Sequence, residues 1–395
     1  MTRHAREVGP DPPRGADDPA TSRARDAVVL VPGFLGFSRF GGFYYFADRL
    51  VAVLRAILEA QLDRAVAVVP CTVLPTDALA ARQQDLVVYL GRLRRERLPD
   101  VERLHLVGHS TGGVDAQLLA CETRLDGSAW SATDRETLAG LTTVVTISAP
   151  HHGTGLANSR LARFAEHPLA DPFAPVVDAR LLADLGILAF RDVAALAGLQ
   201  AARLDDIVRF VGRIVASRAL VHDLRPDSMA AVRRRARQRG DVALTCFASG
   251  TVDTRNGAPV GEPFFRDLYA LTRDGEDAPA PAAARALLRA AATEGRVITS
   301  APAPPPDVCL DMNDGVVNTA RQVLAEGELA ALVLADHADV LGHYDRQDDL
   351  IDGRSYNAGL FHSGAGFRDA EFFALYRRVA RAIAAGIPGA TFAVA

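Results

Sequence analysis

Several features that mark common protein classes are scarce in this sequence of 395 residues. Its four cysteines, Cys71, Cys121, Cys246 and Cys309, are scattered without a CxxC pair. This pattern predicts four reduced, mostly buried thiols. The net charge is only -4, and acidic and basic residues are mixed along the chain, so there is no electrostatic indication of nucleic-acid binding.

Long apolar runs are also absent. Residues 1–26 are rich in Arg, Asp, Pro and Gly and contain no apolar signal-peptide core. No later segment offers the roughly 20 apolar residues that span a bilayer. We therefore expect a cytoplasmic protein with no transmembrane segment and with a disordered N-terminal tail at residues 1–26. Hydrophobic residues still make up 49% of the chain, which is typical of a globular protein with a large core.

Short apolar runs alternate with helical patterns in the first part of the chain. The runs are Ala27–Val31, Val66–Val69, Leu104–Val107 and Val144–Ile147. The helical patterns, with apolar residues three and four apart, are Phe46–Gln61, Asp77–Arg97 and Gly113–Arg124. Strands that are buried on both faces and alternate with helices predict an α/β fold, with a mostly parallel sheet flanked by helices.

Residues 155–240 break this rhythm, because they hold helical patterns such as Ser228–Arg239 and no convincing strand. We predict that this span is a helical cap inserted into the α/β core, which then consists of residues 27–154 and 241–395. The sheet resumes with Val242–Phe247 and Leu329–Leu334, and a closing helix is expected at Asp369–Ala385. Asp274–Ala284 and Ala301–Asp307 are interpreted as Pro/Ala-rich connections.

One pentapeptide carries the clearest chemical signal. Residues 108–112 read GHSTG and fit G-x-S-x-G, directly after the apolar strand Leu104–Val107 and directly before a helical pattern. A sharp strand-to-helix turn of this kind crowds the backbone around the Ser, so it needs Gly on both sides and exposes the hydroxyl above the sheet. Ser110 is therefore the candidate nucleophile; the alternative is a Ser that only caps a helix.

A serine hydrolase also needs two backbone N–H groups that point at the developing oxyanion. Thr111, the residue after the nucleophile, is expected to supply one, and Phe34 in the loop after the first strand the other. Beyond Phe34 the sequence FLGFSRFGGFYYF places a Phe every third residue. We expect Phe37 and Phe40 to line the acyl site or its mouth. The alternative is that these rings only pack the first helix against the cap.

In this fold the acid and the base follow the nucleophile in the chain. Asp314 lies in the turn NDGVV, which leads into an apolar run, and His337 stands three residues after the run ending at Leu334. We expect this acid at one strand end and this base at the next. Asp307 and Asp311 are weaker candidates for the acid, and His343 and His362 for the base. His151 and His152, in the turn APHHGT, are expected to have a structural role near the site.

Residues 27–153 resemble the bacterial true lipases of the α/β-hydrolase fold. The resemblance rests on VLVPGFLGF, the aromatic run ending in FYYF, LHLVGHSTGG and TISAPHHGT, and it continues in NDGVV and HADV near the end of the chain. It implies Ser110 as nucleophile, Asp314 as acid and His337 as base, with Phe34 and Thr111 as the oxyanion hole. The chain departs from those lipases at Pro32, where they usually have His.

The resemblance also bears on metal binding. In those lipases an Asp two residues after the catalytic His can help to bind calcium, and Asp339 occupies that place. A structural calcium ion at Asp339 is thus an expectation, with a solvated Asp as the alternative. No cofactor is expected to be required for the chemistry.

Together these patterns predict a carboxylic ester hydrolase, a lipase or esterase that cleaves esters with an apolar acyl part through an acyl-serine intermediate. Its expected partner is a small-molecule or lipid ester. Two alternatives stay open. An acyltransferase would use the same triad and differ only in its acceptor, and a non-catalytic binding module on the same fold would be expected to carry a degraded triad.

Overall fold

The computed structural model describes residues 24–34, 39–40, 43–73, 77–159, 219–251, 263–344, 350–351, 354–355 and 363–387. In this part of the chain a seven-stranded sheet has the order β4-β1-β5-β6-β7-β9-β8. Its strands are β1 (Asp26–Val31), β4 (Val66–Pro70), β5 (Arg103–His109), β6 (Leu141–Ile147), β7 (Ala243–Gly250), β8 (Val297–Ile298) and β9 (Glu328–Leu334). All neighbouring strands of the sheet pair in parallel.

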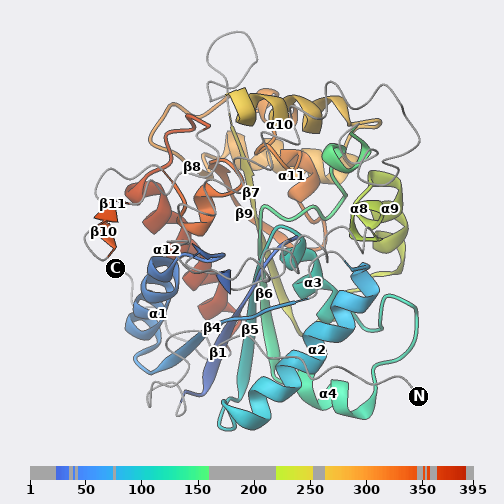
Figure 1. The fold of residues 1–395 in the computed structure, drawn as a ribbon, viewed down its shortest axis with the longest axis vertical. Helices are drawn as coiled ribbons and strands as arrows, with labels where there is room; N and C mark the ends of the chain where they lie inside the picture. The colour runs from blue at the N-terminus through green and yellow to red at the C-terminus, as the bar shows by residue number, and fades with distance from the viewer. Residues whose placement is uncertain are drawn as a thin grey trace.

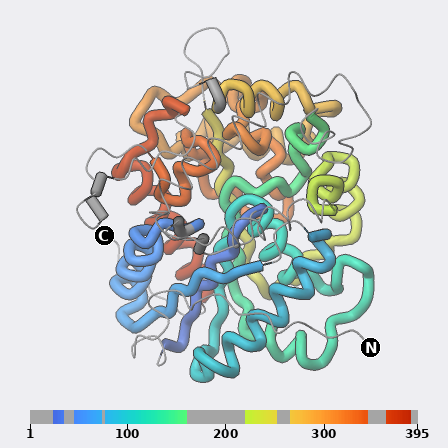
Figure 2. The backbone as a smooth tube through the Cα atoms, in the orientation of Figure 1, coloured from blue at the N-terminus to red at the C-terminus, as the bar shows by residue number. Residues whose placement is uncertain are grey.

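Helices cover both faces of the sheet (Figure 1). The helices α1 (Asp48–Leu62) and α12 (Asp369–Ala385) contact each other on one face, and α12 also contacts β6. The helices α2 (Leu79–Glu96), α3 (Thr111–Leu119) and α4 (Ala132–Leu138) lie on the other. Figure 2 shows α1 in blue beside α12 in red, so segments far apart in the sequence are neighbours.

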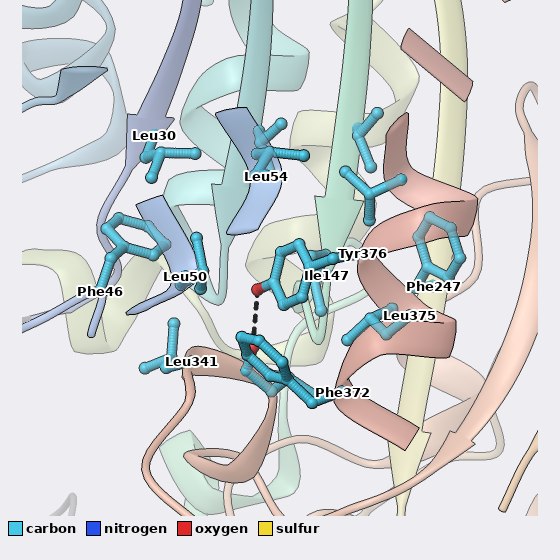
Figure 3. Packing of buried hydrophobic residues seen from close by; sticks show 14 of the residues in the cluster. Leu30, Phe46, Leu50, Leu54, Ile147, Phe247, Leu341, Phe372, Leu375 and Tyr376 are labelled. Carbon is cyan, nitrogen blue, oxygen red and sulfur yellow. Dashed lines mark hydrogen bonds between the residues drawn. The ribbon is translucent and has the colours of Figure 1, made fainter. Parts of the chain in front are cut away.

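The central strands are mostly apolar and are buried on both faces of the sheet. In β1, Val28 and Leu30 belong to the cluster under α1 and α12, whereas Val29 and Val31 belong to the cluster under α2. Side chains alternate between the faces of a strand, so each face of β1 needs its own apolar set. Figure 3 shows the first cluster, which includes Leu30 of β1, Leu50 and Leu54 of α1, and Leu375 and Tyr376 of α12.

Further helices complete the flanks. The helices α10 (Pro263–Asp274) and α11 (Ala282–Thr293) follow β7, and α11 packs on β9 through Ala284 and Leu288. Short 3₁₀ helices lie at Gly155–Asn158, Val308–Leu310, Thr319–Gln322 and Asp339–Leu341. Two small antiparallel pairs, β2 (Arg39–Phe40) with β3 (Phe43–Tyr44) and β10 (Leu350–Ile351) with β11 (Arg354–Ser355), stand apart from the main sheet.

The predicted α/β class, its parallel sheet and the closing helix are confirmed. Two boundaries are wrong. Ala24 and Asp26 are buried, and Asp26 begins β1 with salt bridges to Arg64 and Arg103, so these two residues belong to the core and not to the predicted tail; residues 1–23 lie outside the described part. Asp274–Ala284 is not only a connection, because α11 begins inside it at Ala282.

The predicted cap is described only in part. Its residues 160–218 lie outside the described residues, so the cap stays a prediction. The described end of the span forms α8 (Ala219–Asp223) and α9 (Pro226–Arg235), shorter than the predicted pattern Ser228–Arg239. Leu220, Leu224 and Met229 pack with Leu79 of α2 and Val114 of α3. This end of the span is therefore attached to the helices of the core.

Two further expectations concern the whole chain. All four cysteines are free and buried, as predicted. Burial raises the pKa of the Cys121 and Cys246 thiols to about 12 and that of Cys309 to about 11. Among the helices that the structure describes, none is both long and apolar enough to cross a membrane.

Candidate active site

The candidate site lies where the strand order of the sheet reverses. The chain leaves β1 for β4 on one side and then places β5 on the other side of β1. At such a point the loops after the two central strands diverge and leave a crevice at the carboxyl ends of the strands. Val31 at the end of β1 pairs with Gly108 near the end of β5, so the loop at residues 32–34 begins beside the turn that carries Ser110.

Ser110 sits on a strained turn between β5 and α3. Its φ is 56° and its ψ is -133°, a region that non-Gly residues rarely adopt and that costs on the order of 1–3 kcal/mol. The flanking glycines are required sterically. A Cβ on Gly108 would lie 2.2 Å from the Gly112 carbonyl oxygen, and a Cβ on Gly112 would lie 2.2 Å from the Val31 carbonyl oxygen. This is the geometry expected for the G-x-S-x-G turn.

The loop after β1 approaches Ser110 closely. A Cβ on Gly33 would lie 2.7 Å from the Ser110 Cβ and 3.2 Å from its Oγ, so only Gly leaves the hydroxyl room. Phe34 is partly buried and packs against the apolar cluster that joins α3 and α8. Thr111 is the first residue of α3, where a backbone N–H has no acceptor within the helix.

Asp314 and His337 form a hydrogen-bonded pair. His337 Nδ1 lies 2.8 Å from Asp314 Oδ2, and the His337 backbone N–H donates to the Asp314 carbonyl oxygen at 2.9 Å. Asp314 is fully buried and His337 is 8% exposed. With the proton on Nδ1 directed at the carboxylate, Nε2 of the imidazole is left to accept a proton.

The position of the acid differs from the expectation. Asp314 does not follow a strand of the sheet; it lies in the connection between β8 and β9, and only an isolated bridge joins Asn313 to Asn318. Its carboxylate reaches the sheet edge because Ser249 Oγ, at the end of β7, donates to Oδ2 at 2.7 Å. Backbone N–H groups of Val316 and Val317 donate to Oδ1 at 3.0 and 2.7 Å.

Ser249 and Gln322 were missed at the level of sequence. The Gln322 side-chain amide donates to Asp314 Oδ2 at 3.2 Å, and its oxygen accepts from the Ser249 backbone N–H at 2.6 Å. Neither residue lies in a recognisable motif, and the two are brought to Asp314 only by the fold. The sequence offers one indication for Ser249, which is its position at the end of an apolar strand, where side chains of the site are expected.

The base loop and the Ser110 turn are in direct contact. His109, which precedes Ser110, hydrogen-bonds through Nε2 to the His337 carbonyl oxygen at 2.9 Å, and the two imidazole rings lie 4.6 Å apart. Ser110 itself is 5% exposed. The structure thus gathers the strained Ser, the Gly33 loop and the Asp314–His337 pair at one edge of the sheet.

The weaker candidates for acid and base lie elsewhere. Asp311 is exposed, and the side chain of Asp307 is 91% exposed beside Arg289. His343 hydrogen-bonds through Nε2 to the Tyr45 carbonyl oxygen at 3.1 Å, and His362 lies outside the described residues.

His151 and His152 make structural contacts. His151 is buried, with Nε2 2.9 Å from Thr146 Oγ1, and His152 Nε2 lies 3.0 Å from the Val323 carbonyl oxygen. Burial holds the pKa of His151 well below its usual range. Burial and the neighbouring Arg233 charge lower the pKa of His152 to about 4.

Two predicted residues of the acyl site fall beyond what can be described. Phe37 lies outside the described residues. Phe40 lies in β2, where the structure describes only the backbone. Their role in substrate binding stays a prediction.

The carboxylates of Asp336 and Asp339 are engaged in hydrogen bonds within one turn, and calcium binding at Asp339 stays a prediction. The carboxylate Oδ2 of Asp339 accepts the Asp336 backbone N–H at 3.0 Å, and Asp336 Oδ1 accepts the N–H groups of Ala338 and Asp339. These oxygens are used within a turn. In the part of the chain that the structure covers, no group of three His, Cys, Asp or Glu side chains could hold a metal ion, whereas calcium takes six to eight oxygen ligands.

Comparison with protein-family models and with curated proteins finds no match, whereas solved structures are similar. Lipase 1 from Pelosinus fermentans is 16% identical with a TM-score of 0.51, over 91% of this chain and 98% of that one. EstA from Clostridium botulinum is 16% identical with a TM-score of 0.47, over 85% and 87%. The Staphylococcus hyicus lipase is 16% identical with a TM-score of 0.46, over 93% and 98%.

At such identities the likeness concerns the fold. The similarity to the Pelosinus structure confirms the α/β-hydrolase fold that the sequence resemblance implied. The substrate and the chemistry of this chain have to be argued from its own residues.

Proposed function

We propose that this protein is a serine hydrolase that cleaves carboxylic esters with an apolar acyl part. The observation that carries the proposal is the strained Ser110 at the sheet edge, beside a Gly33 loop and a buried Asp314–His337 pair. The names of similar solved structures, lipases and an EstA, agree with it. Each component serves a different step of acyl transfer.

In the first half of the reaction, the Ser110 oxygen attacks the ester carbonyl carbon while its proton passes to Nε2 of His337. The carbonyl oxygen takes up negative charge, which the backbone N–H groups of Phe34 and Thr111 stabilise. Asp314 stabilises the imidazolium and holds its orientation. When the tetrahedral intermediate collapses, the ester C–O bond breaks and His337 gives its proton to the leaving alcohol.

In the second half, water replaces the alcohol. His337 takes a proton from water as the water oxygen attacks the acyl carbon, and the bond from this carbon to the Ser110 oxygen then breaks. His337 returns its proton to Ser110, and the carboxylic acid is released. An acyltransferase differs only in this half, because another alcohol takes the place of water.

The test uses the intact protein and a fluorophosphonate probe. We expect the probe to label the wild-type chain at Ser110 and to leave Ser110→Ala unlabelled, with p-nitrophenyl ester hydrolysis falling by several powers of ten in the variant. Ser159→Ala, at another buried Ser after a 3₁₀ helix, is the matched control and is expected to label as wild type does.

Two results would overturn the proposal: equal labelling of Ser110→Ala, or a wild-type chain that hydrolyses no ester of any chain length. Adding an alcohol to the assay separates the two enzyme classes. An ester product that outweighs the free acid at low alcohol concentration would identify an acyltransferase.

A further inference from the structure

The loop that is proposed to bear one oxyanion donor lacks a polar side chain of its own. It reads Pro32-Gly33-Phe34, and proline has neither a backbone N–H nor a polar side chain. An oxyanion hole works because its donors are fixed before the reaction begins. The backbone groups of Gly33 must therefore be held by residues from other elements.

The Gly33 backbone has such partners on two sides. On one side it lies against the Tyr45 hydroxyl, and burial raises the pKa of Tyr45, so this hydroxyl keeps its proton. On the other side, the Arg82 Nη2 atom donates to the Gly33 carbonyl oxygen at 3.4 Å. A Cβ on Gly33 would lie 2.5 Å from the Tyr45 oxygen, so the two are in close contact.

The Tyr45 hydroxyl continues into a hydrogen-bond chain with a fixed direction. His109 Nε2 lies 2.9 Å from the His337 carbonyl oxygen, which can only accept, so Nε2 carries the proton. In the neutral imidazole Nδ1 is then an acceptor, and it lies 2.7 Å from the Tyr45 oxygen. Burial, with the nearby His337, holds the pKa of His109 well below its usual range. Tyr45 therefore donates to His109, and His109 donates to the base loop.

Arg82 is fixed by a buried ion pair. Arg82 on α2 and Asp115 on α3 are both fully buried, and the guanidinium donates to both carboxylate oxygens at distances of 2.5 to 3.2 Å. A two-point contact of this kind sets the plane of the guanidinium. Since α3 begins at Thr111, the pair ties the Gly33 carbonyl to the helix that carries the second proposed oxyanion donor.

We propose that Tyr45 is a positioning residue for catalysis, with Arg82 as its partner on the Gly33 carbonyl. Its hydroxyl packs against the Gly33 backbone and is linked, through its hydrogen bond to His109, to the His337 backbone. A single oxygen atom thereby sets the distance between the oxyanion loop, the Ser110 turn and the base loop. The inference rests on the proposed function, because positioning has meaning only if Ser110 reacts.

Tyr45→Phe removes this one oxygen and tests the inference in the full chain. We expect kcat to fall tenfold or more with KM changed less than twofold, because the loop acts on the developing oxyanion and not on binding. The loss should be the same for short and long acyl chains. A Tyr45 ring that served only to line the acyl site would instead affect long chains selectively. The rate of fluorophosphonate labelling should fall by a similar factor.

Tyr344→Phe is the matched control. The Tyr344 hydroxyl is also hydrogen-bonded, 2.6 Å from Arg49 Nη1 and 2.5 Å from Asp369 Oδ1 in partly buried contacts, and neither partner belongs to the site. We expect Tyr344→Phe to lower Tm and to leave kcat within twofold of wild type. A Tyr45→Phe variant that behaves in the same way, with a lower Tm and unchanged kcat, would overturn the inference.

A second variant covers the case in which Tyr45→Phe is too unstable to assay. His109→Gln keeps a donor for the His337 carbonyl but lacks the Nδ1 acceptor, and it should also lower kcat tenfold or more; a kcat within twofold of wild type would contradict the inference. A wild-type chain that neither hydrolyses esters nor takes up the probe would overturn the proposed function as well. An active wild type with unimpaired variants overturns the positioning role alone.

Discussion

At the scale of single residues, the carboxylate of Asp314 is the most heavily hydrogen-bonded group of the candidate site. It accepts from two backbone N–H groups on Oδ1 and from Ser249, Gln322 and His337 on Oδ2. Such a carboxylate cannot turn away from the imidazole, so the tautomer of His337 is fixed before any substrate binds. The ability of Asp314 to orient His337 therefore depends on these hydrogen-bond donors as well as on the charge of the carboxylate.

Asp314→Asn tests this role with a minimal change of volume. The Asn oxygen can still accept the Val316 and Val317 N–H groups, so we expect the fold to survive. Its NH₂ group would face His337 Nδ1 as a second donor, which favours the wrong tautomer, and kcat should fall on the order of a thousandfold or more. Steady-state kinetics with p-nitrophenyl esters and a thermal melt check both parts.

Asp307→Asn is the control for Asp314→Asn, because Asp307 is a neighbouring acid whose side chain is 91% exposed. It should keep full activity. A loss at Asp307 equal to that at Asp314, or an Asp314→Asn enzyme with wild-type kcat, would contradict the assignment of the acid.

At the scale of elements, close backbone contacts restrict the turn from β5 into α3, so that only Gly fits at certain positions. Gly112 lies so close to β1 that its added Cβ would be 2.2 Å from the Val31 carbonyl oxygen and 2.5 Å from that of Pro32. These atoms are backbone and cannot rotate away, as a flexible side chain can. The turn and the oxyanion loop can therefore keep their distance only with Gly at this position.

Gly112→Ala is accordingly expected to lower the free energy of unfolding by about 3 kcal/mol or more and to abolish ester hydrolysis. Gly240→Ala is the matched control, because no atom lies within 4 Å of its added Cβ; its stability should change by less than about 1 kcal/mol. Urea unfolding of both variants measures the difference. Equal stabilities would show that the turn can relax, against the steric argument.

How much of this could be predicted depended on the kind of signal. The strand β1 was predictable because both of its faces are buried, and Ser110 because the turn imposes glycines at fixed spacing. The helix α11 was missed, since Pro and Ala together suggested a connection although Pro281 precedes the helix and Ala favours it. Tyr45 and Ser249 could not be predicted as partners of the site, because only the fold brings them to His109 and Asp314.

At the scale of the whole molecule, several histidines are buried within the folded chain. Burial lowers the pKa of His105, holds those of His109 and His151 well below the usual range, and together with Arg233 lowers that of His152 to about 4. His105 and His109 belong to β5, whereas His151 and His152 lie in the turn after β6. Burial in the folded chain therefore favours their neutral form, and acid should destabilise the fold.

The free energy of unfolding should fall as the pH falls, because the unfolded chain then binds more protons than the folded chain. An unfolded His titrates near pH 6.5, so between pH 6.5 and pH 4 the unfolded chain binds a proton at position 152 that the folded chain does not. The stability that the folded chain gains by keeping His152 neutral is complete above about pH 7. It is lost as the pH falls from 6.5 towards 4. For His152 alone the loss between pH 7 and pH 5 is on the order of 2 kcal/mol.

His152→Gln should keep a donor for the Val323 carbonyl oxygen and remove the titration. We expect the variant to lose on the order of 2 kcal/mol less unfolding free energy than wild type between pH 7 and pH 5, as measured by urea denaturation at each pH. His222→Gln, at a side chain that is 64% exposed, should reproduce the wild-type slope. If His152→Gln and wild type lose the same stability on acidification, then His152 is not held neutral by the folded protein, and the acid sensitivity must come from the other buried histidines.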